Sequence, residues 1–206
     1  MKREEKNALS RQRILDAAMR EFSQKGYDAA SLNTICAENG ISKGIIYHHF
    51  KDKDALYLLC AAHCFGGLTA HLAAWAAKGA ENPETRLRQY FDARLRYFAN
   101  YPVCLGIFLN AVLYPPAHLS AELAEIRRAF DNQNVAILTK LLTCASLRRG
   151  ITVSAVVDDF RMYMDYFNAK YQTVLAQADS PEQALREHEE RCHRQLEILL
   201  YGVLEK

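Results

Sequence analysis

Residues 40–53, GISKGIIYHHFKDK, gather side chains that can recognise DNA. The ammonium group of Lys43 can reach a guanine edge or a phosphate, and Ile45 can contact a thymine methyl group. Gly44 between them has no side chain, so the backbone can approach a nucleic acid closely. Lys53 opens a predicted helix, where a lysine together with the helix N-terminus favours a phosphate. The chemistry that this segment indicates is binding to duplex DNA.

Two short helices and a tight turn are predicted to present these side chains. The segment SLNTICAENG, residues 31–40, has a helical apolar period, and Gly40 suits the left-handed conformation of a helix C-cap. Ser42 can act as the N-cap of the next helix. Two helices joined by a short turn with glycine form the helix-turn-helix pattern, whose second helix enters the major groove. In the first helix of the pair, Ser31 and Asn33 lie at the end expected to abut the DNA backbone.

A second group of chemically capable side chains is Cys60-x-x-His63-Cys64. Positions i, i+3 and i+4 lie close together on a helix, so three soft ligands can converge. Zinc would need a fourth ligand, and a reactive thiol would need an electropositive, partly exposed setting. The favoured interpretation is two buried thiols and a histidine on the inward face of a long helix. No metal and no cofactor are therefore predicted, and a metal or redox sensor stays an alternative function.

Aromatic and amide side chains recur through the apolar helical segments of residues 83–170. A largely apolar cavity with a few polar groups is typical of small-molecule sites, so this region is predicted to bind an effector, with Arg94 able to pair an acidic one. The candidate effector-binding residues are His63, Tyr90, Arg94, Tyr97, Phe108, Asn110, Phe130, Asn134, Tyr163 and Phe167. The alternative is that the aromatic rings fill a large core and that Asn110 bonds a backbone carbonyl.

The charge distribution places a basic excess at the same end as the helix-turn-helix pattern. Residues 1–53 hold 10 Lys+Arg against 7 Asp+Glu, and the remainder holds 16 against 17. This modest excess suits local phosphate contacts better than unspecific coating of nucleic acid. No apolar run follows the opening MKREEKN, and no uncharged stretch is expected to be long enough for a bilayer. We predict a cytoplasmic protein without a membrane segment, whose six cysteines are reduced and mostly buried.

The secondary structure is predicted to be all-α, because glycine and proline are sparse and no strand-like alternation recurs. Residues 1–9 are predicted to fray. Periodicity, caps and breakers predict about nine helices, near residues 10–25, 31–39, 42–50, 52–78, 83–100, 103–114, 120–149, 154–178 and 181–204. We expect a helix-turn-helix DNA-binding domain at residues 1–52 and an effector-binding and dimerisation domain at residues 53–206.

Residues 13–56, RILDAAMREFSQKGYDAASLNTICAENGISKGIIYHHFKDKDAL, resemble the TetR family of bacterial transcriptional regulators. The pattern G-[IV]-S-x-G-x-[IL]-Y-x-[HY]-F-x-x-K is matched at Gly40, Ile41, Ser42, Gly44, Ile46, Tyr47, His49, Phe50 and Lys53. The rest of the chain resembles the family only in length and helical layout. The resemblance implies that Tyr47 and His48 project outward at positions that bind phosphate and base. We also predict a DNA contact for His49, although its ring can instead pack into the small core.

The resemblance also implies an assembly and a mechanism. Family members are homodimers whose N-terminal heads bind a palindromic operator in double-stranded DNA and whose bodies bind a small-molecule effector. Effector binding changes the separation of the heads and lowers operator affinity, and most members are repressors. The last two helices usually pair across the two-fold axis, and the apolar surplus on the C-terminal hairpin agrees with an interface. The predicted dimer-interface residues are Phe160, Met164, Tyr171, Leu196 and Leu199.

Two other classes of function are alternatives to a ligand-responsive repressor. An enzyme is not predicted, because the chain has no P-loop, no H-E-x-x-H motif and no predicted strand to support a glycine-rich dinucleotide turn. A DNA-binding regulator without a small-molecule effector stays open. A body completely filled by its own side chains would favour that second regulator.

Overall fold

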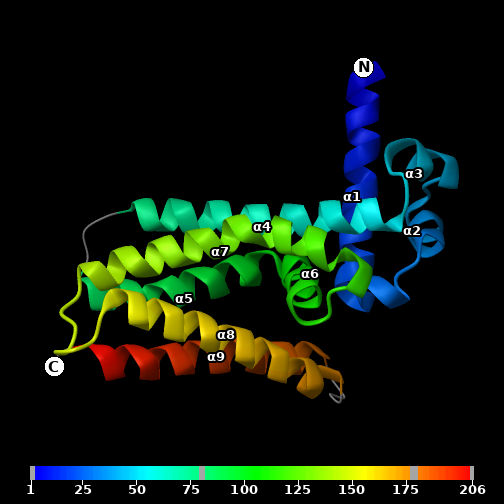
Figure 1. The fold of residues 1–206 in the computed structure, drawn as a ribbon. Coiled ribbons are helices and arrows are strands. Elements are labelled where there is room, and N and C mark those ends of the chain that lie inside the picture. Colours follow the sequence, from blue (N-terminus) through cyan, green and yellow to red (C-terminus); the bar gives the residue numbers. More distant parts are fainter. Residues whose placement is uncertain (1–2, 79–81, 177–180, 205–206) are drawn as a thin grey trace. The chain divides into compact units, whose positions relative to one another are not determined.

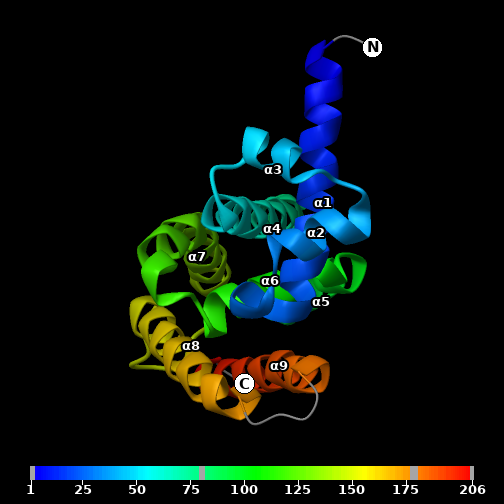
Figure 2. The same cartoon turned by 90° about the vertical axis from the view of Figure 1, so that its right-hand side faces the viewer.

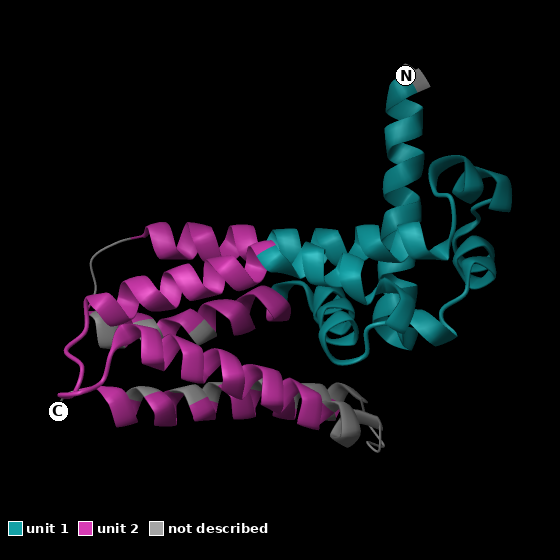
Figure 3. Cartoon of the chain, in the orientation of Figure 1, with its two compact units in different colours: residues 1–67, 100–128 teal, residues 68–99, 129–206 magenta. Residues whose placement is uncertain are grey.

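The computed structural model of the protein describes residues 3–78, 82–176 and 181–204. These ranges are helical, apart from turns and one isolated antiparallel bridge between Leu147 and Leu204. The predicted all-α fold is therefore confirmed, and Figures 1 and 2 show the helices in chain order. The chain divides into two compact units (Figure 3). The first unit comprises Met1–Gly67 and Asn100–Arg128, and the second comprises Leu68–Ala99 and Ala129–Lys206.

The first unit contains the helix-turn-helix segment. Its elements are α1 (Arg3–Ala29), α2 (Leu32–Asn39), α3 (Lys43–His49), the first part of α4 (Lys53–Ala77), α6 (Pro102–Leu113), the 3-10 turn η1 (Ala117–Leu119) and the start of α7 (Ser120–Thr143). α1 begins at Arg3 and not near Ser10, because Glu4 and Glu5 complement the positive end of the helix dipole. The predicted fraying of residues 1–9 is thus wrong from Arg3 onward. Gly26, with φ 70°, interrupts α1 where the sequence predicts its end.

The predicted apolar faces of the first three helices form the core of the first unit. Ile14, Ala18 and Phe22 of α1 follow one another at i, i+4 and i+8 and are fully buried. Ile35 of α2 and Ile46 of α3 are each 1% exposed. Full burial of one such large apolar side chain contributes roughly 1.5–3 kcal/mol. This shared core fixes α2 and α3 against α1.

α1 also packs closely against α6 within the first unit. A Cβ atom at Gly106 of α6 would lie 2.7 Å from the backbone oxygen of Ser23, so only glycine permits this approach. One turn later, Asn110 Nδ2 donates to the carbonyl oxygens of Gly106, at 2.8 Å, and Phe22, at 3.4 Å. The absence of a side chain at Gly106 therefore lets the two helices approach closely, and the amide of Asn110 bridges them.

α4 is the most apolar long helix among the described residues. Positions 55–77 contain no Asp, Glu, Lys or Arg, and by length and composition the helix could cross a membrane. The α6 and η1–α7 pair, bent by 94°, passes the same test if taken as one span. The prediction that no uncharged stretch is long enough is therefore wrong. Leu56, Cys60, Leu68 and Leu72 of α4 are nevertheless fully buried, as in the core helix of a folded domain.

The second unit contains the remainder of α4 and α7 together with α5 (Pro83–Asn100), α8 (Val153–Ala176) and α9 (Pro181–Val203). α7 ends at Thr143 and does not continue to residue 149 as predicted. The reason is long-range bonding: the Arg148 N–H group donates to Val203 O at 2.9 Å, and Arg148 Nε donates to Leu204 O at 3.1 Å. These bonds satisfy carbonyls at the end of α9 in place of a further turn of α7.

α8 and α9 form the predicted hairpin. Its inner face is aromatic: the ring centroid of Phe167 lies 4.8 Å from that of Tyr171 and 4.9 Å from that of His188. His188 is 1% exposed, and its Nε2 atom lies 3.0 Å from Asn168 Oδ1. The buried histidine thus has a polar partner inside the hairpin.

Candidate nucleic-acid interface

The turn between α2 and α3 has the predicted geometry. Gly40 adopts the left-handed conformation, with φ 59° and ψ 36°. The next N–H group, of Ile41, donates to Cys36 O at 3.0 Å, and the Ile41 side chain is buried. Ser42 Oγ accepts from the Ile45 N–H group at 3.4 Å. Both helix ends that meet at the turn are therefore capped, which fixes the direction in which α3 leaves α2.

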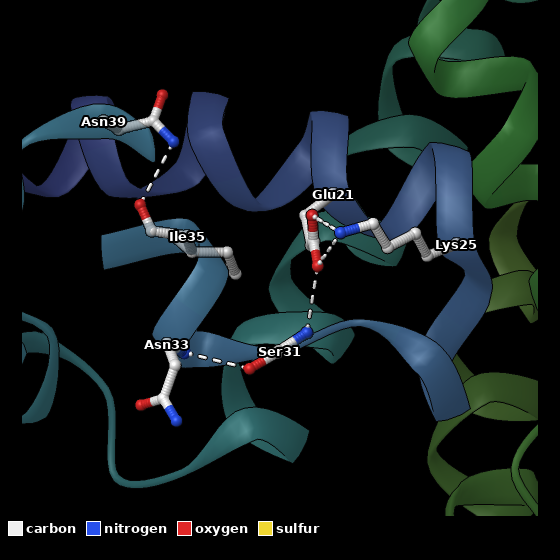
Figure 4. Close-up of polar contacts among 6 residues, drawn as sticks. All are labelled: Glu21, Lys25, Ser31, Asn33, Ile35 and Asn39. Atoms are coloured by element: carbon white, nitrogen blue, oxygen red, sulfur yellow. Dashed lines mark hydrogen bonds and ion pairs between the residues drawn. The ribbon is translucent and has the colours of Figure 1, made fainter. Parts of the chain in front are cut away.

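Glu21 anchors the start of α2, as Figure 4 shows. This carboxylate is only 5% exposed, and its Oε1 atom accepts from the Ser31 N–H group at 3.1 Å. Lys25 Nζ pairs with the same carboxylate at 3.0 Å. Ser31 Oγ in turn accepts from the Asn33 N–H group at 3.1 Å. Glu21 was not predicted from the sequence, because no local pattern marks a bond to a residue ten positions further along the chain.

The C-terminus of α2 is tied to α1 by two arginines. Arg13 Nη2 donates to the Asn39 backbone oxygen at 3.3 Å, and Arg20 Nη2 donates to Asn39 Oδ1 at 2.8 Å. Asn39 Nδ2 donates to Ile35 O at 3.1 Å (Figure 4). These two cationic groups are therefore partly occupied in holding the helix-turn-helix unit together.

α3 exposes the predicted base-reading side chains on the surface of the first unit. Ile45 is 43% exposed and Tyr47 is 58% exposed, whereas Ile46 between them is buried. The exposed residues of this short helix are Lys43, Gly44, Ile45, Tyr47 and His48. A cation, an apolar group and an aromatic hydroxyl thus lie together with no protein covering them. This combination can contact phosphate, a thymine methyl group and a base edge.

His49 lies at the margin of this surface. It is half-buried, and its ring centroid lies 5.0 Å from that of His48 and 6.3 Å from that of Phe50. Burial, followed by the nearby His48 and Arg11, lowers the pKa of His49 below its ordinary value. The ring is therefore neutral at pH 7 and can both donate and accept a hydrogen bond.

Lys53 supplies the positive charge at the start of α4. Its Nζ atom lies 4.4 Å from the ring centroid of Tyr27 and 3.3 Å from Asp28 O. Asp52 Oδ1 accepts from the Ala55 N–H group at 2.8 Å, so a carboxylate already caps this helix. The helix N-terminus therefore contributes less to phosphate binding than expected. A phosphate at this position would interact mainly with the charge of Lys53.

The Cys60, His63 and Cys64 side chains do not converge. Cys60 and Cys64 are buried, whereas His63 is exposed, so its predicted inward position is wrong. Burial raises the pKa of the Cys60 thiol. The pKa of the Cys64 thiol is raised by its hydrogen bond with the Cys104 thiol and by burial. Protonated buried thiols are poor ligands and nucleophiles. Across the described residues, no group of three or more His, Cys, Asp or Glu could hold a metal ion.

The predicted effector-binding residues fall into both units. His63, Phe108 and Asn110 belong to the first unit, and the other seven belong to the second. In the second unit the Tyr90 hydroxyl donates to Asn134 Oδ1, and burial raises the pKa of Tyr90. Buried polar groups in an apolar environment, including the 7% exposed Arg94, are what a pocket for a partly polar ligand requires.

The outer face of the α8–α9 hairpin carries exposed apolar side chains. These are Met162 and Tyr166 of α8, 64% and 65% exposed, and Ile198 and Tyr201 of α9, both 56% exposed. These residues were not predicted as an exposed face, although their i, i+4 and i, i+3 spacings place each pair on one side of its helix. An open groove of about 480 Å³ on this hairpin is lined by Tyr163, Phe167, Glu187, Glu190, Arg191, Arg194 and Gln195.

The predicted dimer-interface residues are less exposed than the side chains on the outer face of the hairpin. Tyr171 is 3% exposed because it packs against His188, and Phe160, Met164 and Leu199 are half-buried. The side chain of Leu196 lies outside the described residues. The sequence pattern therefore marks mainly the inner face of the hairpin, because its most regular apolar period serves the contact between α8 and α9.

A capped helix-turn-helix with an exposed second helix defines the class of helix-turn-helix DNA-binding proteins. Residues 14–60 match the family model for bacterial regulatory proteins of the tetR family. The N-terminal segment of the chain is thus similar in sequence to the DNA-binding domain of tetR-family regulators.

The relatives that match in sequence are transcriptional regulators, not enzymes. An HTH-type transcriptional repressor of Mycobacterium tuberculosis is 46% identical over 54 residues, which cover 26% of this chain and 29% of that protein. The HTH-type transcriptional regulator AcrR of Shigella flexneri is 50% identical over 48 residues, covering 23% and 22%. The chain thus spans less than a third of the length of these curated relatives.

Solved structures match over nearly the whole chain. The transcriptional regulator FadR of Bacillus subtilis, in complex with stearoyl-CoA, has a TM-score of 0.67 at 17% identity and covers 93% of this chain and 98% of its own. PfmR of Thermus thermophilus has a TM-score of 0.60 at 24% identity, covering 95% and 97%. At these identities the likeness shows the fold alone.

Proposed function

We propose that the protein is a cytoplasmic, dimeric transcriptional repressor that binds a palindromic operator and is released from it by a small-molecule effector. Residues 1–52 would bind DNA, and residues 53–206 would bind the effector and the second protomer. The observation that carries the proposal is the exposed surface of α3, which follows a turn capped on both sides. The similarity of the chain to repressors and regulators of the HTH type supports the same function.

Base and phosphate contacts would come from different parts of the first unit. Lys43, Ile45 and Tyr47 would read the major groove, with Gly44 allowing close approach. His48 and His49 would contact bases or phosphates beside them. The N-terminus of α2, at Ser31 and Asn33, and the turn residue Ser42 would face the DNA backbone, together with Lys53.

Effector release would use the second unit. Tyr90 and Arg94 are buried and Asn134 is half-buried, and these polar groups among apolar neighbours would contact polar atoms of a ligand. The FadR structure, with its bound stearoyl-CoA, shows that this fold accommodates a small molecule in that protein. A two-fold dimer would place two copies of α3 about 34 Å apart, one turn of DNA, as a palindrome requires.

Binding to the DNA upstream of the protein's own gene tests the proposal. Fluorescence anisotropy at fixed salt, with competitor DNA present, should show saturable binding of two protomers to one palindrome. Lys43→Ala and Tyr47→Ala should each weaken this binding by roughly 5- to 150-fold, because each removes a contact of about 1–3 kcal/mol. Sedimentation should show an unchanged oligomeric state in both variants.

The matched control is Lys140→Ala, which removes an exposed lysine from α7 in the second unit. Its operator affinity should equal that of the wild type. Wild-type affinity for both variants of α3 would overturn the recognition-helix assignment. A repressor that no metabolite extract releases from DNA would favour the regulator without an effector.

A further inference from the structure

Tyr27 connects three segments of the first unit that are distant in the sequence. It follows the break of α1 at Gly26, and its hydroxyl donates to Asp54 Oδ1 in the first turn of α4. His118 of η1 approaches both groups: its Nε2 atom lies 3.3 Å from Tyr27 Oη and 3.3 Å from Asp54 Oδ2. The phenol is therefore held at its polar end from two directions.

The ring of Tyr27 is held as firmly as its hydroxyl. Its centroid lies 5.1 Å from that of the fully buried Tyr57 and 6.5 Å from that of Phe22, and the His118 ring meets its edge at 5.5 Å. Aromatic contacts at these separations favour fixed relative orientations. The Tyr27 ring is thus a rigid surface beside the first turn of α4.

Lys53 rests on this surface. Its ammonium lies 4.4 Å from the Tyr27 ring centroid, within the range of a cation–π contact, and 3.3 Å from Asp28 O. Lysine has a long, flexible stem, and an unsupported ammonium loses conformational freedom when it binds a phosphate. A ring and a carbonyl that already restrict the stem reduce this loss.

The charges around the ring matter as well. Asp28, Asp52 and Asp54 all lie near the Tyr27 hydroxyl, and they outnumber the single ammonium of Lys53. The Asp54 carboxylate is shared between the Tyr27 hydroxyl and His118. The hydrogen bonds from Tyr27 and His118 and the charge of Lys53 all lower the pKa of Asp54, so the carboxylate that the two side chains hold in place stays charged and attracts the Lys53 ammonium.

We propose that Tyr27, Asp54 and His118 are positioning residues that hold the Lys53 ammonium for a DNA phosphate. The inference rests on the proposed operator binding and adds the α6–α7 connection, through His118, to the parts of the chain that set DNA affinity. The sequence alone does not indicate it, because the three residues share no motif and no helix face.

A double-mutant cycle on operator binding tests the inference. Lys53→Ala should weaken binding about threefold to tenfold at moderate salt and lower the salt dependence by about one ion per protomer, as expected for one phosphate contact. Tyr27→Leu should reproduce most of both changes. In the Lys53→Ala background, Tyr27→Leu should have no further effect, because its target is gone.

Two milder variants guard against a simple loss of folding. Tyr27→Phe keeps the ring and should cause a smaller loss than Tyr27→Leu. His118→Gln changes a side chain that is 55% exposed and should also weaken binding only when Lys53 is present. Circular dichroism should be unchanged in both, and Lys140→Ala, which removes an exposed lysine of the second unit, should leave affinity and salt dependence unchanged.

The outcomes separate the inference from the proposed function. Equal losses from Tyr27→Leu with and without Lys53 would show a purely structural role and overturn the inference. Wild-type salt dependence in Lys53→Ala would also overturn it, while operator binding itself would stand. A wild-type chain with no preference for any upstream DNA would overturn the proposed function and the inference with it.

Discussion

At the level of single residues, burial distinguishes the side chains that build the helix-turn-helix unit from the side chains that can touch DNA. Ile45 and Ile46 are neighbours of the same type, yet only Ile45 is exposed. The helical period predicts this difference, because Ile46 and Phe50 share one face. Glu21 could not be predicted in the same way, since its partner Ser31 lies ten positions further along the chain. A local pattern shows a face but does not show which buried polar atom will find a partner.

Loss of the Glu21 carboxylate should destabilise the first unit. Glu21→Ala leaves the N–H group of the half-buried Ser31 without its acceptor, which costs roughly 1–3 kcal/mol. Urea unfolding at pH 7 measures the loss of free energy. The matched control is Lys25→Ala, which removes the other member of the ion pair; Lys25 is 40% exposed, so its contribution is expected to stay below about 1 kcal/mol. Equal losses in the two variants would assign the effect to the ion pair and not to the bond with Ser31.

Tyr27 should make stability depend on pH in the alkaline range. Burial, and then its bond to Asp54, raises the pKa of Tyr27 from 10 to about 12. Between these values the folded chain keeps a proton that the unfolded chain releases, so stability falls as pH rises. Tyr27→Phe should therefore show a shallower fall in unfolding free energy between pH 10 and pH 12. Tyr57 and Tyr90, whose pKa values burial also raises, should keep part of the slope in both proteins.

Helices are the scale at which the sequence was most informative. Caps at Gly40 and Ser42 predicted the turn between the two short helices, and the structure shows both caps in place. The end of α7 could not be predicted, because Arg148 bonds to carbonyls of α9 more than fifty residues away. Helix periodicity also selected the inner face of the α8–α9 hairpin over its exposed face. Long-range bonds and the choice between two apolar faces are tertiary features, and local patterns do not contain them.

Gly106 should be essential to the contact between α1 and α6. Gly106→Ala places a methyl group against the backbone of Ser23, and such overpacking costs typically about 1–3 kcal/mol. Thermal unfolding should show a lower midpoint. Gly66→Ala in α4 is the matched control, because nothing lies within 4 Å of its Cβ position and alanine favours a helix by up to about 1 kcal/mol. A Gly106→Ala variant as stable as the Gly66→Ala variant would contradict the close approach of the two helices.

The whole molecule was predictable in class but only partly in its sites. Helical periods predicted the all-α fold, and the match at residues 40–53 predicted the exposed surface of α3. The contact of Tyr27 with Asp54 and His118 was not predictable, because the end of α1 and η1 reach α4 only in the folded chain. The candidate effector residues fall into both units for a related reason: aromatic side chains in helices have the same pattern in a core and in a pocket.

At the scale of the whole molecule, the exposed apolar residues of the α8–α9 hairpin are candidates for the contact between two protomers. Tyr166→Asp and Ile198→Asp place a charge on the outer face of the hairpin, where each wild-type side chain is more than half exposed. If this face joins two protomers, each variant should sediment as a monomer. Operator affinity should then fall by at least about 100-fold, because the second half-site no longer binds intramolecularly. Leu9→Asp, which changes an equally exposed apolar residue of α1, should leave the oligomeric state unchanged. Dimers in both hairpin variants would move the interface to another face and would leave Tyr166 and Ile198 without a role in assembly.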